Sequence, residues 1–214
     1  MSRKGERGMK TTVFLVRHGE TQWTVEDRFN GHTDMSLTDY GRSQAKHLAL
    51  RLGEESIIAA YCSPLRRCVE TATLVAEPHI ITPIIRDGLV ELDYGAWDGM
   101  PRQEIAVQYP DEWTAWVKDP AVVAPPQGET GYAALTRSVA VLREIVVQHV
   151  GQAILVVAHK AINRLLLCEI LGIPPRNYRS RIEQFACALN CIEWHNDEPL
   201  VTLVNDTSHY SQTT

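Results

Sequence analysis

Two histidines and two arginines stand where apolar runs of the sequence end. Arg17 and His18 follow "FLV", and His159 follows "AILVVA". Arg67 lies in "SPLRR", directly after a third apolar run. Guanidinium groups match phosphate oxygens with paired, charge-assisted hydrogen bonds, and an imidazole can act as a nucleophile or carry a proton. These residue types indicate a site for a small anion, and phosphate fits them best.

A metal centre is the alternative for paired histidines. Arginines beside the histidines would repel a cation, and no carboxylate stands at ligand spacing from His18 or His159. We therefore expect no metal ligands and no other cofactor.

The apolar runs that end in these residues predict β-strands. Thr12–Val16, Ile57–Tyr61 and Ala153–His159 are continuous apolar or β-branched stretches, as in strands covered on both faces. Helices are predicted at Leu37–Leu52, Pro64–Glu77, Pro101–Tyr109, Thr130–Val150 and Ile162–Leu171. This alternation predicts an α/β fold, a three-layer α/β/α sandwich with a mostly parallel central sheet. Ligands of such sheets bind beyond the carboxyl ends of the strands, where the histidines and arginines would converge.

Three further segments complete the expected sheet. Ile80–Ile85 contains Pro83, which restricts it to an edge or broken strand. Ala186–Trp194 and Leu200–Val204 are expected to form a hairpin with "HNDE" as its turn. Residues 92–129 are irregular but rich in tryptophan and proline, so we expect a folded insert over the active site rather than a linker.

The length of 214 residues fits one medium domain, expected at residues 11–205. Residues 1–10 are expected to be a disordered tail and residues 206–214 a polar tail. A net charge of −5 argues against general attraction to nucleic acid or anionic membranes, and no apolar run approaches the roughly 18 residues that span a bilayer. Five cysteines without CxxC spacing predict reduced thiols and a cytoplasmic location.

Taken in order, the motifs of the chain resemble those of the histidine phosphatase superfamily. The matching stretches are "LVRHGET", "GHTDMSLTDYGRSQA", "SPLRRCVETA", "LVELDYGAWDG", "QGET" and "VVAHKAINRLLL". More narrowly, they are similar to the branch that holds cofactor-dependent phosphoglycerate mutases and the small phosphatases related to them. The resemblance runs from about Thr12 to about Trp194.

The resemblance implies a role for each matching residue. His18 matches the nucleophile that takes the phosphoryl group, and Glu91 matches the proton donor and acceptor. Arg17, Arg67 and His159 match the groups that hold the phosphate. Glu91 lies among apolar residues in the sequence, and such surroundings raise the pKa of a carboxyl group.

Other positions of the expected pocket differ from the family's usual residue or have two interpretations. Thr24 stands where the family often has asparagine, and Asn30 where related phosphatases often have glutamine. Both can still donate hydrogen bonds to a phosphate. Gly128 and Glu129 either cap the helix that follows or present backbone amides to the ligand.

Lys160 departs most clearly from the family, which usually has glycine or alanine after the second histidine. It either faces solvent at the start of a helix or contacts a second anionic group of the substrate. Asn163 and Arg164, one turn further along, have the same two interpretations.

The resemblance implies a metal-independent phosphatase that hydrolyses a small phosphomonoester through a phosphohistidine intermediate. A phosphoglycerate mutase is the main alternative. Mutases usually carry a longer insertion than the 67 residues that separate Glu91 from His159, and a shorter cover leaves the pocket more open to water. An α-ribazole phosphatase and a catalytically silent binder of phosphorylated ligands are further alternatives. The expected partner is a small phosphorylated metabolite; the resemblance is compatible with a homodimer, but no residue pattern marks an interface.

Overall fold

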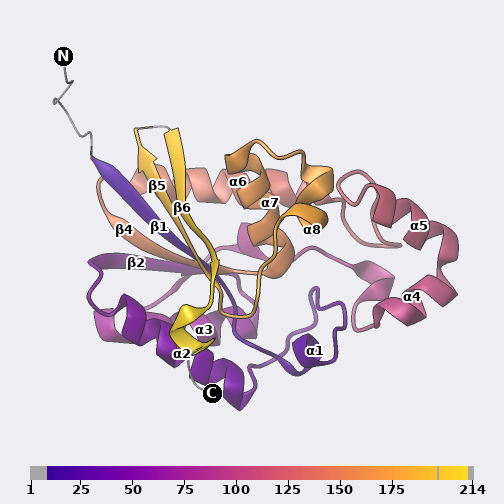
Figure 1. The fold of residues 1–214 in the computed structure, drawn as a ribbon, viewed down its shortest axis with the longest axis horizontal. Helices are drawn as coiled ribbons and strands as arrows, with labels where there is room; N and C mark the ends of the chain where they lie inside the picture. Colours follow the sequence, from indigo (N-terminus) through magenta and orange to yellow (C-terminus); the bar gives the residue numbers. More distant parts are fainter. Residues whose placement is uncertain (1–8, 197, 212–214) are drawn as a thin grey trace.

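A six-stranded sheet forms the centre of the computed structural model, which describes residues 9–196 and 198–211 (Figure 1). In sheet order, the strands are β3 (Ile84–Ile85), β2 (Ile57–Cys62), β4 (Ala153–Ala158), β1 (Lys10–Arg17), β5 (Leu189–His195) and β6 (Glu198–Asp206). The first four are parallel, whereas β5 pairs antiparallel with β1 and with β6. The prediction of a mostly parallel sheet is therefore confirmed.

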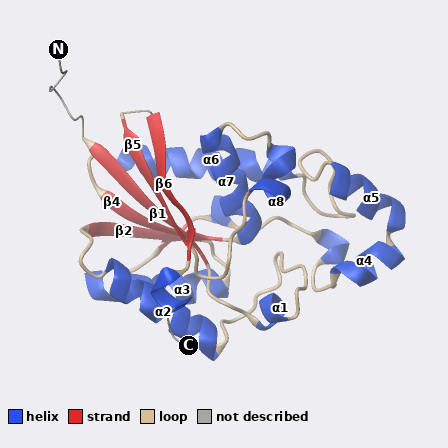
Figure 2. Ribbon diagram, in the orientation of Figure 1, coloured by secondary structure: helices blue, strands red, loops and turns tan. Residues whose placement is uncertain are grey.

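Helices cover both faces of the sheet (Figure 2). One layer contains α2 (Asp39–Leu52) and α3 (Arg66–Ala76), and the other contains α6 (Gly131–Gln148) and α7 (Lys160–Leu171). The strands alternate accordingly: Phe14 and Val16 pack into the core under α2 and α3, whereas Val13 and Leu15 pack into the core under α6 and α7. This two-sided burial explains the continuous apolar strands and confirms the α/β/α sandwich.

Two helices, α4 (Arg102–Gln108) and α5 (Pro110–Lys118), project beyond one end of the sheet (Figure 1). The sequence predicted α4 but not α5, which begins with Pro110 at its first position, where the missing N–H has no cost. The insert packs with Phe29, from an earlier part of the chain, in an apolar cluster built around Phe29, Trp97 and Trp116. Its tryptophans therefore pack together rather than face solvent.

Short elements complete the chain. They are α1 (Gln22–Val25), α8 (Tyr178–Arg181), α9 (Ser208–Ser211) and the 3₁₀ turns Glu77–His79, Asp87–Leu89, Gly95–Trp97 and Pro175–Asn177. The strand predicted at 80–85 is reduced to Ile84–Ile85, because Ile80 adopts a left-handed conformation with φ of 57°. As expected, what remains of it is an edge strand.

The two ends of the chain extend the fold beyond the expected limits. Strand β1 begins at Lys10, and β6 continues to Asp206, followed by α9, which packs against α2. Residues 1–8 and 212–214 of the expected tails, and residue 197 of the expected turn, lie outside the described residues. Within the described part of the chain, none of the helices has the length and apolar character needed to cross a bilayer.

Candidate active site

The register of two parallel strands brings His18 and His159 side by side. Arg17, the last residue of β1, pairs with Ala158, the last residue of β4, so each histidine directly follows a strand end. Their ring centroids are 5.2 Å apart. Gly19 allows the chain to turn closely past α2 here, because a Cβ atom at this position would lie 2.6 Å from the carbonyl oxygen of Gly41.

His18 is held as a neutral imidazole with one free nitrogen. Its Nδ1 lies 2.8 Å from the carbonyl oxygen of Gly19, which can only accept, so Nδ1 carries the hydrogen and Nε2 keeps its lone pair. The ring is 3% exposed. Burial, followed by the positive charges of Arg67 and Arg17, holds its pKa well below the usual value.

Arg67 is buried behind the two histidines and holds His159. Its Nη1 donates to the carbonyl oxygen of Thr33 at 2.9 Å, its Nη2 to that of Gly31 at 2.6 Å, and its Nε to Nδ1 of His159 at 3.3 Å. His159 Nε2 then donates to the Ser63 hydroxyl at 2.7 Å. Burial and then Arg67 hold the pKa of His159 well below its usual value. The positive charge beside His18 therefore comes from the arginines and not from His159.

Glu91 is 3% exposed, and its buried carboxyl group lies against the N-terminus of α7, although Glu91 itself is far from that helix in the sequence. One oxygen accepts from the amide of Leu92 at 2.8 Å and the other from the amide of Ala161 at 3.2 Å. Because the side chain of His159 does not cap the helix, Glu91 takes this role. Burial raises the pKa of Glu91, and the two amide hydrogen bonds offset part of the increase.

A cavity of about 120 Å³ opens in front of these groups. Of the residues predicted to form the site, its lining includes Arg17, His18, Thr24, Asn30, Glu91 and Lys160. Arg67 and His159 lie behind His18, with no exposed surface. Gly128 and Glu129 do not belong to the lining.

Gly128 and Glu129 lie outside the cavity lining, beside the loop of Glu91. Their amides are already bonded, that of Gly128 to the carbonyl of Pro125 at 2.9 Å and that of Glu129 to the carbonyl of Asp93 at 3.0 Å. The Glu129 carboxylate accepts from the amide of Asp93 at 3.1 Å. Neither residue is proposed as a ligand contact.

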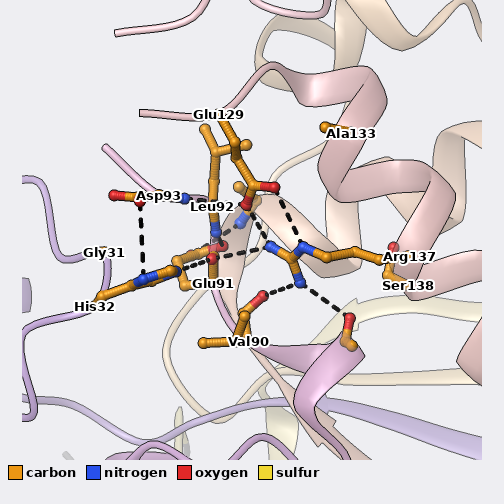
Figure 3. A network of polar contacts seen from close by, with 12 residues as sticks. Gly31, His32, Val90, Glu91, Leu92, Asp93, Glu129, Ala133, Arg137 and Ser138 are labelled. Atoms are coloured by element: carbon orange, nitrogen blue, oxygen red, sulfur yellow. Dashed lines mark hydrogen bonds and ion pairs between the residues drawn. The ribbon is translucent and has the colours of Figure 1, made fainter. Parts of the chain in front are cut away.

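Arg137, on α6, fixes the backbone of the same loop (Figure 3). Its Nη1 donates to the carbonyl oxygen of Gly88 at 3.0 Å and to that of Val90 at 2.7 Å, and its Nη2 donates to that of Glu91 at 3.0 Å. Glu129 pairs with the same guanidinium. No sequence pattern indicates this contact, because Arg137 is one of several polar residues on a long helix.

His32 adds a further contact to this loop. Its Nε2 donates to the carbonyl oxygen of Glu91 at 2.9 Å, so this carbonyl accepts from both His32 and Arg137. The backbone on either side of the Glu91 carboxyl group is therefore held in place.

The cavity wall also contains basic and aromatic side chains that sequence reasoning did not select. They are Trp23, Arg28, Tyr94, Arg102, Tyr178 and Arg179. Most lie on short helices or the turns beside them, where no strand end marks their position. Arg164 also lines the cavity. A ligand contact was one of the two interpretations of this residue.

The cavity is equipped for an anion. The Nε atoms of Arg17 and Arg164 and the hydroxyl of Tyr178 are buried, with no hydrogen-bond partner among residues 9–196 and 198–211. Burial lowers the pKa of Arg17 only to about 10, so it stays charged at neutral pH. No group of three His, Cys, Asp or Glu side chains within the described residues is arranged to hold a metal ion.

The fold and the strand-end histidines together define a class of phosphoryl-transfer enzyme. The family model of the histidine phosphatase superfamily (branch 1) matches residues 13–207. The chain belongs to this superfamily, as its motifs predicted, and it is a phosphomonoester hydrolase.

Relatives and solved structures agree with this assignment. The chain is 31% identical to phosphoserine phosphatase 1 of Hydrogenobacter thermophilus over 94% of each chain. It is 31% identical to an adenosylcobalamin/α-ribazole phosphatase of Salmonella typhimurium, over 80% of this chain and 86% of the relative. Among solved structures, Bacillus stearothermophilus YhfR superimposes with a TM-score of 0.88 at 31% identity, covering 93% of this chain and 98% of the other.

Proposed function

We propose that the protein hydrolyses a small phosphomonoester in two phosphoryl transfers, with His18 Nε2 as the acceptor in the first. The observation that carries this proposal is a neutral imidazole whose free nitrogen faces a cationic cavity. The named relatives, which are phosphatases, support hydrolysis over the mutase alternative. Five unpaired thiols suit a reducing compartment, so we also propose a cytoplasmic location.

In the first transfer, the lone pair of His18 Nε2 forms a bond to phosphorus while the bond from phosphorus to the ester oxygen breaks. Protonated Glu91 gives its proton to the leaving alkoxide. Arg17, at the cavity wall, stabilises the negative charge on the non-bridging oxygens of the phosphoryl group, and the buried Arg67 contributes its positive charge from behind His18. The hydrogen bond from Nδ1 to Gly19 keeps the attacking tautomer in place.

In the second transfer, water replaces His18. Glu91, now a carboxylate, takes a proton from a water molecule while the oxygen of that water attacks phosphorus. The bond between phosphorus and Nε2 breaks, its electron pair returns to the imidazole, and inorganic phosphate leaves. Both steps need the same carboxyl group first as an acid and then as a base, which suits the raised pKa of Glu91.

Thr24 and Asn30 are proposed as neutral hydrogen-bond partners of the phosphate at the cavity wall. Both meet Thr21: the two threonine hydroxyls are 3.0 Å apart, and the Asn30 amide nitrogen donates to Thr21 Oγ1 at 3.4 Å. A small rotation of either side chain would redirect a donor to the ligand.

Trapping the intermediate tests the proposal. A phosphomonoester labelled in its phosphoryl group is mixed with enzyme and quenched in alkali during the first turnovers. We expect label on the peptide that contains His18, stable in alkali and lost in acid, and turnover that persists with a chelator present. Turnover with label on another residue, or with no labelled protein at all, would contradict the proposal, and interconversion of 2- and 3-phosphoglycerate would favour the mutase.

Arg137→Met is expected to lower kcat for an alkyl phosphate by up to about 100-fold, because small misplacements of catalytic groups cost this much. The carbonyl oxygens of Gly88 and Val90 lose this donor and that of Glu91 keeps only His32, so the Glu91 carboxyl group is held less firmly. The loss for p-nitrophenyl phosphate is expected to be smaller, because nitrophenolate leaves without protonation. Equal losses of kcat for both substrates would indicate a purely structural role for Arg137. The control is Arg143→Met, which changes an exposed residue on the same helix.

A further inference from the structure

Two cations on one face of α7 line the cavity next to the proposed phosphoryl site. Lys160 and Arg164 are four residues apart, so their side chains lie one above the other on the helix. Both contact one carboxylate oxygen of Glu183: Lys160 Nζ lies 3.1 Å from it, and Arg164 Nη2 donates to it at 2.6 Å. One anionic group is therefore already bound by both cations.

The charge around this pair is unbalanced. Arg17 lies close to the two cations and Glu183. Its Nη1 donates to the carbonyl oxygen of Gln184, the residue after Glu183, at 2.9 Å. Lys160 and Arg164 pair with Glu183 itself, whereas Arg17 bonds to the carbonyl beside it, and the Arg164 Nε remains buried without a hydrogen-bond partner in the described part of the chain. Burial, then Arg17 and Arg164, lower the pKa of Lys160 to about 8, so the charged form of Lys160 depends on a carboxylate bound at this pair.

Glu183 is bound in a way that allows exchange. Its side chain is 47% exposed, whereas that of Arg164 is 9% exposed. Ion pairs with an exposed partner contribute little to stability, because water competes for the carboxylate. Arg164 is largely buried on α7 and Lys160 is partly exposed, whereas the Glu183 carboxylate, which also accepts from the amide of Gln184 at 2.8 Å, lies on a loop at the surface.

We propose that Lys160 and Arg164 form a subsite for a carboxylate of the substrate, which takes the place of the Glu183 carboxylate when substrate binds. The inference rests on the proposed function, in which His18 receives the phosphoryl group. The substrate class is then a small phosphomonoester that carries a carboxylate near the ester.

Matched pairs of esters test the subsite. O-phosphoserine differs from O-phosphoethanolamine by one carboxylate, and 3-phosphoglycerate carries a carboxylate where glycerol 3-phosphate carries a hydroxymethyl group. Calorimetry in a His18→Ala background gives Kd without turnover. We expect the carboxylated member of each pair to bind roughly 10- to 100-fold more tightly, as for hydrogen bonds between charged groups.

Lys160→Ala is expected to reduce the preference for the carboxylated ester at least about tenfold in both pairs. Arg181→Ala changes an exposed arginine two residues before Glu183 and is expected to leave this preference unchanged. Glu183→Gln is expected to strengthen binding of the carboxylated esters, because it removes the competing carboxylate. An unchanged preference in Lys160→Ala would overturn the subsite, and weaker binding in Glu183→Gln would overturn the exchange. Because these values are affinities, they decide the subsite even if trapping finds no phosphohistidine.

Discussion

Replacement of His18 by alanine is expected to lower kcat/KM for any phosphomonoester by at least about 10⁴-fold, the scale on which loss of a nucleophile acts. No other side chain at the cavity combines a free nitrogen lone pair with a nearby guanidinium pair among the described residues. The variant is expected to retain affinity for phosphate, because Arg17 still lines the cavity. Steady-state kinetics and phosphate titration measure the two effects separately.

Two controls keep the His18 result specific. The side chain is buried, so thermal unfolding must show that the alanine variant is folded, and His18→Asn provides a second variant closer in volume. His47→Ala changes a half-buried histidine on α2 outside the cavity and should keep full activity. An active His18→Ala protein would refute the phosphohistidine mechanism, whereas partial recovery of its activity by added imidazole would support it.

Replacement of Glu91 by glutamine is expected to reduce kcat for an alkyl phosphate by about 10³- to 10⁴-fold, the upper range for loss of general acid–base catalysis. Glutamine keeps an oxygen for one of the two amide hydrogen bonds but cannot transfer a proton. With p-nitrophenyl phosphate, the first transfer needs no acid, whereas the second still needs a base. Stopped-flow measurements should therefore show a burst of about one nitrophenolate per enzyme, followed by slow turnover.

The pH profile provides a second measurement of the same group. Phosphoryl transfer from an alkyl ester needs Glu91 protonated, so kcat/KM should fall as pH rises through the pKa of Glu91, which burial raises above its usual value. On the acid side, kcat/KM falls only when His18 becomes protonated, and the pKa of His18 lies well below the usual value. Glu91→Gln should lack the alkaline fall. A pH profile of the same shape in the unmodified protein and in Glu91→Gln would exclude Glu91 as the acid. The control is Glu112→Gln, which changes an exposed residue on α5.

The sequence was most informative where residue type and strand end coincide. His18 and His159 follow apolar runs that are buried on both faces, and parallel register places such ends at one edge of the sheet. The tryptophans of the segment at residues 92–129 pack in a cluster, as expected for a folded segment rather than a linker. These features follow from local composition and from the rules of parallel sheets.

The supports of the site could not be predicted in this way. Arg137 reaches the Glu91 loop from a helix 46 residues further along the chain, and Glu129 serves that arginine rather than a ligand. Such contacts depend on how α6 packs beside the loop, which no local pattern encodes. The protonation state of His159 is a second example, because the donor from Arg67 that keeps it neutral comes from α3.

The separate apolar cluster of the insert has a consequence for how such enzymes diverge. The reacting groups rest on the two cores that flank the sheet, whereas the far wall of the cavity rests on Phe29, Trp97 and Trp116. Mutations can therefore accumulate in one module with little penalty to the other. Substrate preference can therefore change through replacement of the aromatic cluster, or of a single residue such as Lys160, while the catalytic residues stay the same.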